Sequence, residues 1–199
     1  WFGWYGFNGG SALSASGDAA SAILNTHMAA CAAALIWILL ERARIGKATS
    51  IGIVTGAVAG LATVTPAAGY IGIAGAIALG TLGGLVCFFA VQLVKQTLKI
   101  DDSLDVFAVH GVGGMLGSVL FPLFMLPSFG GDGFSNDQSL AGQLGAQALA
   151  VGLVAAWTGL ATWLFCAASK GLLPMRVDEE AEHDGLDLSS HGERGWELD

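Results

Sequence analysis

The chain has 199 residues, of which 54% are hydrophobic and only 12% are charged, and its mean hydropathy is +0.65. Soluble domains carry about 25% charged residues, so this composition excludes an ordinary soluble domain and indicates an integral membrane protein. The net charge of −8 belongs mostly to residues 171–199, which carry nine acidic and two basic side chains. No basic patch remains elsewhere, and we therefore expect no nucleic-acid partner.

Six apolar stretches follow one another along the chain, separated by turn-forming residues such as Gly17 and Pro66. A helix needs about 20 apolar residues to cross the ~30 Å hydrocarbon core of a bilayer. The predicted transmembrane spans are 1–14, 19–41, 48–65, 70–94, 104–126 and 138–169. Because the first stretch is already apolar at its first residue and no signal peptide is visible, we expect the C-terminal part of a longer polypeptide, with its first span truncated.

The basic residues predict the orientation of these spans. All eight lie at alternate junctions or in the C-terminal tail, namely Arg42, Arg44, Lys47, Lys95, Lys99, Lys170, Arg176 and Arg194. The remaining junctions carry none, namely 15–18, 66–69 and 127–137. Cytoplasmic loops are enriched in Lys and Arg, so the pattern predicts a multi-pass membrane domain over 1–170, a cytoplasmic acidic tail over 171–199 and an external loop at 128–137.

The first span begins with an aromatic-rich segment, WFGWYGFNGGSA. Trp4, Phe7 and Ser11 are spaced i, i+3 and i+7, so on a helix they share one face. Ring faces attract cations and a hydroxyl accepts a hydrogen bond, which makes this face a candidate cation site near the external side. The alternative is a belt of aromatic side chains at the membrane interface.

One histidine lies in the second span, in the segment NTHMAACAAA. His27 is about two helical turns inside that span from its external end. Because Asn25 and Thr26 precede it, we expect His27 to be a hydrogen-bonded residue between helices or at the interface rather than a functional one.

The fifth span opens with DDSLDVFAVHGVGG. Asp102 and Asp105 have the spacing of an N-cap and its third helical residue, so we expect them to cap a helix that starts near Ser103. His110 then lies roughly 10 Å inside that helix. Ionisable residues within a span are rare and mostly line a pathway or face the bundle interior, and the glycines that follow His110 leave room for a solute.

Four separated stretches of the chain resemble the signature sequences of ammonium transporters of the Amt/Mep/Rh family. They are WFGWYGFNGGSAL, VAGLATVTPAAGYIG, DDSLDVFAVHGVGG and GLDLSSHGE. The resemblance implies an all-α, polytopic transmembrane bundle with eleven helices, arranged as two inverted repeats of five and a final long helix, in homotrimers with one pore per subunit. This chain then corresponds to helices six to eleven, half of the fold.

The resemblance also implies roles for single residues. His110 matches the second of two paired pore histidines, Phe7 one of two stacked phenylalanines that gate the external entrance, and Ser11 the hydroxyl of the external recruitment site. The other matches are to pore-lining positions, and to one near the outer vestibule: Trp4, Val106 and Thr65. The tail is expected to dock on the cytoplasmic face of the inner (plasma) membrane, to couple subunits and to help PII-type signal proteins regulate the pore.

The predicted function is therefore transport of ammonium or ammonia, without enzymatic activity, cofactor or metal. Two routes stay open: the histidines relay a proton separately from ammonia, or they only select and ammonia alone is conducted. A transporter-like ammonium sensor is the alternative function, although the tail is short for a signalling output. An intramembrane hydrolase is a weaker alternative, because Asp105 and His110 are poorly spaced to pair on one helix and neither GxSxG nor HExxH occurs.

Overall fold

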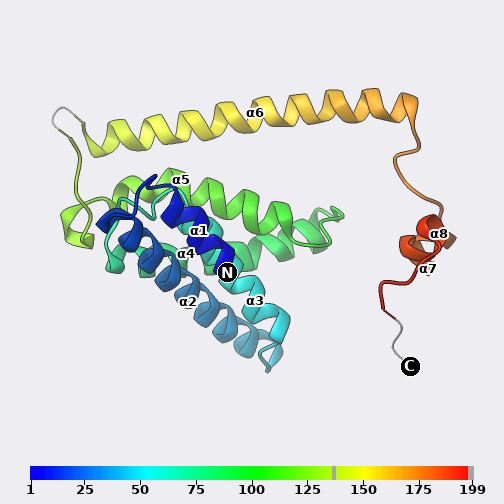
Figure 1. The fold of residues 1–199 in the computed structure, drawn as a ribbon, viewed down its shortest axis with the longest axis horizontal. Coiled ribbons are helices and arrows are strands. Elements are labelled where there is room, and N and C mark those ends of the chain that lie inside the picture. The colour runs from blue at the N-terminus through cyan, green and yellow to red at the C-terminus, as the bar shows by residue number, and fades with distance from the viewer. Residues whose placement is uncertain (136–137, 197–199) are drawn as a thin grey trace. The chain divides into compact units, whose positions relative to one another are not determined.

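The structure, a computed structural model, describes residues 1–135 and 138–196. Every regular element in these two ranges is helical, and no strand occurs in them (Figure 1). The α-helices are α1 Phe2–Gly10, α2 Gly17–Ile45, α3 Ser50–Val64, α4 Ile73–Gln92, α5 Val112–Phe124, α6 Leu140–Leu172, α7 Glu179–Asp184 and α8 Leu186–His191. Shorter turns complete them: the π-helical turns η1 Leu93–Thr97 and η2 Val106–Gly111, and the 3-10 turn η3 Pro127–Phe129.

Four helical segments in the described part of the chain are long and apolar enough to cross a membrane. They are Gly17–Ile45, Ile73–Thr97, Val106–Phe124 and Leu140–Leu172, and they match four of the six predicted spans. The all-α, multi-pass prediction is confirmed, whereas two predicted spans form shorter helices, nine residues in α1 and 15 in α3. α3 ends at Val64, one residue before the predicted limit, because Pro66 lacks a backbone N–H and the chain turns over residues 65–70.

The end of α2 and the start of α3 are fixed by polar groups. Gly46 ends α2 at φ +77°, a conformation that favours glycine. Thr49 then caps α3, its hydroxyl accepting a hydrogen bond from the Gly52 N–H at 2.9 Å. Glu41 holds this cap in turn, because its buried carboxylate accepts from the Thr49 N–H at 2.7 Å and from the Thr49 hydroxyl at 3.0 Å.

α2, α3 and α4 form the centre of the bundle, each packed against the other two (Figure 1). Small residues allow their backbones to approach closely. A Cβ atom placed on Gly60 would lie 2.5 Å from the carbonyl oxygen of Ala29, and one on Gly84 would lie 2.9 Å from that of Ala33. Larger side chains at these glycines would therefore force the helices apart.

α5 packs against both α3 and α4, again through glycines. A Cβ on Gly113 would lie 2.9 Å from the Thr63 hydroxyl oxygen, and one on Gly117 would run into the Thr63 carbonyl group. On the α4 side, the Cys87 thiol donates to the carbonyl oxygen of Val109 at 3.7 Å. These contacts set the depth and rotation of the helical segment that carries His110.

The chain divides into two compact units, Trp1–Val151 and Gly152–Asp199. The first contains α1 to α5 and all the candidate site residues. The second contains the later part of α6 and the short helices α7 and α8. Within it, Asp178 caps α7 by accepting from the Ala181 N–H at 2.8 Å, and Arg176 forms an exposed ion pair with Glu182 at 3.3 Å.

Candidate functional site

The indole ring of Trp4, on α1, is the centre of the candidate site. Its N–H donates to the Thr65 hydroxyl at 2.8 Å, at the C-terminal end of α3. Its ring stacks on the imidazole of His110, with centroids 5.9 Å apart and planes at 19°. The Phe7 ring meets the indole edge-on, with centroids 6.3 Å apart and planes at 72°. Residues from three distant parts of the sequence therefore meet around one aromatic side chain.

The helix that carries His110 starts later than the sequence predicted. It begins at Val106 rather than near Ser103, and its first turn, η2, is π-helical. Asp105 is the N-cap residue, in the left-handed region at φ +56°, and its side chain makes no capping hydrogen bond. Asp102 lies before the helix, and its carboxylate accepts from the Phe107 N–H at 3.3 Å and the Ala108 N–H at 3.0 Å.

The predicted capping arrangement is thus corrected in its register. Asp102 does bind the free N–H groups of the first turn, but from outside the helix, and Asp105 is not the third residue of a capping box. Asp105 makes no capping-box hydrogen bond because its carboxylate instead forms an ion pair with Lys95, whose Nζ lies 2.7 Å from Oδ1 of Asp105. His110 lies only four residues after the helix start, about 6 Å along the axis rather than roughly 10 Å.

The remaining predicted site residues lie on α1 or on η2, the turn that precedes α5. Val106 and His110 are one turn apart in η2, and both side chains are exposed. Phe7 is also exposed, and its contact with Trp4 confirms that these two rings share a face of α1. Ser11 is the C-cap of α1, and its hydroxyl donates to the Phe7 carbonyl oxygen at 2.7 Å, which leaves its oxygen free to act as an acceptor.

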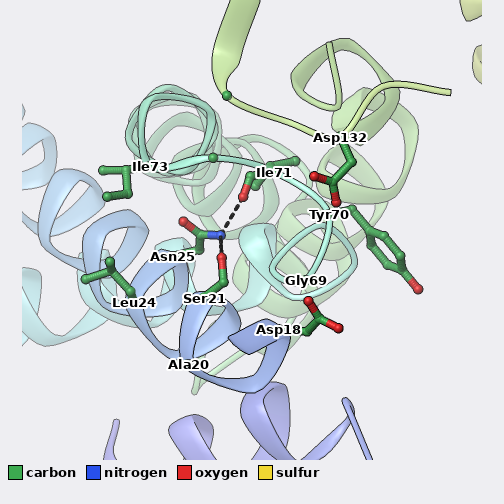
Figure 2. Close-up of a pocket in the computed structure, with 12 residues that line it drawn as sticks. Asp18, Ala20, Ser21, Leu24, Asn25, Gly69, Tyr70, Ile71, Ile73 and Asp132 are labelled. Carbon is green, nitrogen blue, oxygen red and sulfur yellow. Dashed lines mark hydrogen bonds between the residues drawn. The ribbon is translucent and has the colours of Figure 1, made fainter. Parts of the chain in front are cut away.

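Two buried polar residues, which the sequence analysis named only as neighbours of His27, hold this arrangement together. The first is Asn25 on α2, only 1% exposed. Its side-chain N–H groups donate to the carbonyl oxygen of Ala68 at 2.9 Å and to that of Ile71 at 2.6 Å, the second of which Figure 2 shows. These bonds tie α2 to the turn that follows Thr65, and so fix the hydroxyl that binds the indole.

The second is Thr26, the next residue of α2. Its hydroxyl accepts a hydrogen bond from the side chain of Asn8 on α1 at 2.9 Å and donates to the carbonyl oxygen of Ala22 at 2.6 Å. α1 is thereby fixed one turn beyond Trp4. The sequence feature that could have indicated these two bonding residues is the NT dipeptide within an apolar span, since polar groups in a bilayer need internal partners.

His27 lies apart from the Trp4 centre. Its Nδ1 is 2.6 Å from the Tyr5 hydroxyl oxygen, and its Nε2 is 3.6 Å from the Cys31 sulfur. This hydrogen bond from α2 to α1 confirms the prediction of a hydrogen-bonded histidine between helices. His27 therefore contacts α1 through Tyr5, whereas His110 contacts it through Trp4.

A pocket of about 570 Å³ opens beside Asn25, at the end of the bundle that carries no basic residues. The carboxylates of Asp18 and Asp132 border it, together with the Tyr70 ring (Figure 2). Acidic groups around a hollow favour cations over anions near it. Among the described residues, no group of three or more His, Cys, Asp and Glu side chains is placed to hold a metal ion.

A sequence profile described as the Ammonium Transporter Family matches residues 1–196. The chain belongs to the ammonium transporter family. Among relatives, ammonium transporter Amt1 of Archaeoglobus fulgidus is 42% identical over 97% of this chain and 49% of its own length. The ammonium transporter of Bacillus subtilis is 41% identical over 99% of this chain and 49% of its own. The chain spans about half the length of the curated relatives it matches.

Solved structures of ammonium transporter family proteins have the same fold. One named Sensor Amt Protein matches with a TM-score of 0.87 at 34% identity, covering 96% of this chain and 46% of that one. Mep2 of Candida albicans matches with a TM-score of 0.80 at 38% identity, covering 90% and 41%. The predicted family and the predicted half of the Amt/Mep fold are both confirmed.

Proposed function

We propose that this chain forms one half of the wall of an ammonium-conducting pore, with Trp4 and His110 at its centre. The stacking of the His110 ring on the Trp4 indole is the observation that carries the proposal. It puts a group that can exchange protons against a ring face that attracts cations, within a family of ammonium transporters. The exposed sides of both rings are available to a solute and to the facing half of a pore.

In a membrane-embedded pore, the groups that bind an ammonium ion at the entrance cannot by themselves carry it through the apolar part of the path. Moving a bare ammonium ion into a medium of low dielectric constant costs tens of kcal/mol by Born reasoning, and a cation–π contact returns about 2 kcal/mol when desolvated. Aromatic rings therefore bind ammonium only near the external entrance, where water still solvates it. We propose that the ion is recruited by the Ser11 oxygen and the Trp4 and Phe7 rings, and that Phe7 is part of a gate beyond which the path is dry.

Beyond this gate, His110 has two proposed modes of action. In the first, ammonium loses its proton, neutral ammonia passes along the Val106 side of the path, and His110 and a partner histidine in the facing half relay the proton. In the second, the imidazoles only select, and neutral ammonia alone is conducted. Currents across a reconstituted membrane separate the two, because only the first is electrogenic.

The assembly is proposed from the resemblance to the ammonium transporter family. We propose a homotrimer in the inner (plasma) membrane, with the tail 171–199 on the cytoplasmic face and accessible to a PII-type signal protein. The distribution of the eight basic residues supports this orientation. The carboxylate of Asp105 pairs with Lys95, so this residue does not orient the His110 imidazole as a hydrolytic site would require.

The test of the proposed function compares two histidine variants in vesicles. We expect His110→Ala to change methylammonium uptake or its selectivity at several pH values without loss of folding. His27→Ala is the matched control, because it removes an imidazole bound to Tyr5 instead of Trp4. Unchanged uptake in a well-expressed His110→Ala variant, at every pH, would contradict the role of His110.

A sensor is the second candidate, favoured by the structural match to the protein named Sensor Amt Protein. A sensor would bind ammonium and change a signalling partner, with little net flux. Uptake by vesicles, measured beside ammonium binding at equilibrium, distinguishes the two functions: binding without uptake supports the sensor, and sustained uptake supports the transporter.

A further inference from the structure

An ion pair links the end of α4 to the start of the helix that carries His110. Lys95 belongs to the π-helical turn η1, and its Nζ lies 2.7 Å from Oδ1 of Asp105 and 3.4 Å from the Ser103 carbonyl oxygen. The Asp105 side chain is 18% exposed and that of Lys95 is 36% exposed. The pair is therefore partly shielded from solvent, unlike an exposed surface ion pair.

Asp105 depends on this partner more than its exposure suggests. Its Oδ1 atom is buried, and among the described residues it accepts no directed hydrogen bond, so that the charge of Lys95 is its compensation there. Its backbone is in the left-handed region at φ +56°, which L-residues other than glycine, asparagine and aspartate rarely adopt. Removal of Lys95 would leave a buried carboxylate oxygen without a counter-charge at the residue that starts η2.

The turn after Asp105 has little other support at its start. Asp102 accepts hydrogen bonds from the Phe107 and Ala108 N–H groups, but Asp102 itself lies in an irregular segment between η1 and η2. The next polar contact, from Cys87 to Val109, is a weak thiol hydrogen bond at 3.7 Å. The later part of the turn is held by packing, since Val109 is buried in a cluster with Ala59 and Cys87. At the start of the turn, the charge contact with Lys95 is the strongest polar link to α4.

We propose that Lys95 is a positioning residue for His110. Its ammonium group holds Asp105 in the left-handed conformation from which η2 starts, and so fixes the wide turn that brings the His110 ring against Trp4. Lys95 touches neither ring and acts chiefly through Asp105, with a longer hydrogen bond to the Ser103 carbonyl oxygen. The consequence for conduction rests on the proposed transport function, whereas the structural consequence does not.

Four variants of the membrane-reconstituted protein test this proposal. Lys95→Met and Asp105→Asn remove the ion pair, and asparagine keeps the shape and the tolerance of positive φ. Lys95→Arg keeps the charge, and Lys99→Met is the matched control, since it removes a lysine charge from the same connection. Hydrogen–deuterium exchange over residues 100–115 reports on the turn, and methylammonium uptake per folded molecule reports on the site.

We expect the η2 amides to exchange about tenfold faster in Lys95→Met and Asp105→Asn, because the turn opens locally more often. In Lys95→Arg and Lys99→Met the exchange should stay at the wild-type rate. In the first two variants the maximal uptake rate should fall severalfold while the KM stays within about twofold, because the external binding groups lie on α1. A loss of folded protein alone would leave the rate per folded molecule unchanged.

Each result decides the proposal. Wild-type exchange of η2 in Asp105→Asn overturns it, even if Lys95→Met fails to fold. Faster exchange with an unchanged uptake rate also overturns it, because the turn would then not matter for His110. If the wild-type protein takes up no methylammonium, the proposed transport function fails, and the exchange arm still shows whether Lys95 holds the turn.

Discussion

The close packing of α5 on α3 predicts opposite effects for two alanine substitutions on one helix. A Cβ on Gly117 would run into the Thr63 carbonyl group and would also lie 3.1 Å from the Pro66 ring. A Cβ on Gly114 meets no atom within 4 Å among the described residues. Gly114→Ala is therefore a control that makes the same chemical change, in the same helix, without the collision.

The difference in the free energy of unfolding between the two variants follows from two contributions. Replacing glycine by alanine within a helix stabilises it by about 1 kcal/mol, and this gain is common to both variants. Overpacking a close contact costs about 1–3 kcal/mol, and only Gly117→Ala meets it, against a backbone carbonyl that no side-chain rotation can move. The free energy of unfolding should therefore be about 1–3 kcal/mol lower for Gly117→Ala than for Gly114→Ala.

The assay is unfolding by SDS in mixed micelles, followed by circular dichroism on the two variants and the wild type. Gly114→Ala should unfold at the wild-type SDS fraction or above it, and Gly117→Ala at a clearly lower SDS fraction than Gly114→Ala. Methylammonium uptake should also fall in Gly117→Ala, because a displaced α5 moves the His110 ring away from Trp4. Equal stability of the two variants would refute the proposed close contact between α5 and α3.

Three further predictions concern hydrogen bonds. Asn25→Leu should lower the free energy of unfolding by about 2–4 kcal/mol, since two buried carbonyl oxygens lose their donor; SDS titration measures it, and a loss under 1 kcal/mol would contradict this. Trp4→Phe and Thr65→Val should each lower the free energy of unfolding by about 1 kcal/mol. The double variant should lose little more, because both substitutions remove the same hydrogen bond. Glu41→Ala should cost about 2 kcal/mol by removing both bonds to Thr49, seen as a lower thermal midpoint.

The helical spans could be predicted from hydropathy because apolar length is a local property of the sequence. The end of α3 could also be predicted, since Pro66 is a turn signal directly after the predicted span 48–65 and α3 ends at Val64. What stabilises the turn that follows could not. The turn is stable because Asn25, on another helix, donates to its carbonyl oxygens. That partner is distant in the sequence, and spacing rules do not report on distant partners.

In the candidate site too, local features could be predicted and contacts between distant residues could not. The helical spacing of Trp4 and Phe7 predicted their shared face, and the local D-x-x-D pattern predicted a cap near His110. The pattern gave the wrong register because Lys95, from the preceding helix, competes for the Asp105 carboxylate. The stacking of Trp4 on His110 could not be derived from spacing, since it joins two helical segments that are far apart in the sequence.

The bond between Trp4 and Thr65 has a consequence for the hydration of any conduction path beside it. The indole has a single N–H, and that N–H is already engaged by the threonine oxygen. A water molecule beside the ring finds carbon and π electrons and no donor. Water molecules in any path beside this ring are therefore held less firmly on that side than they would be beside a free N–H group.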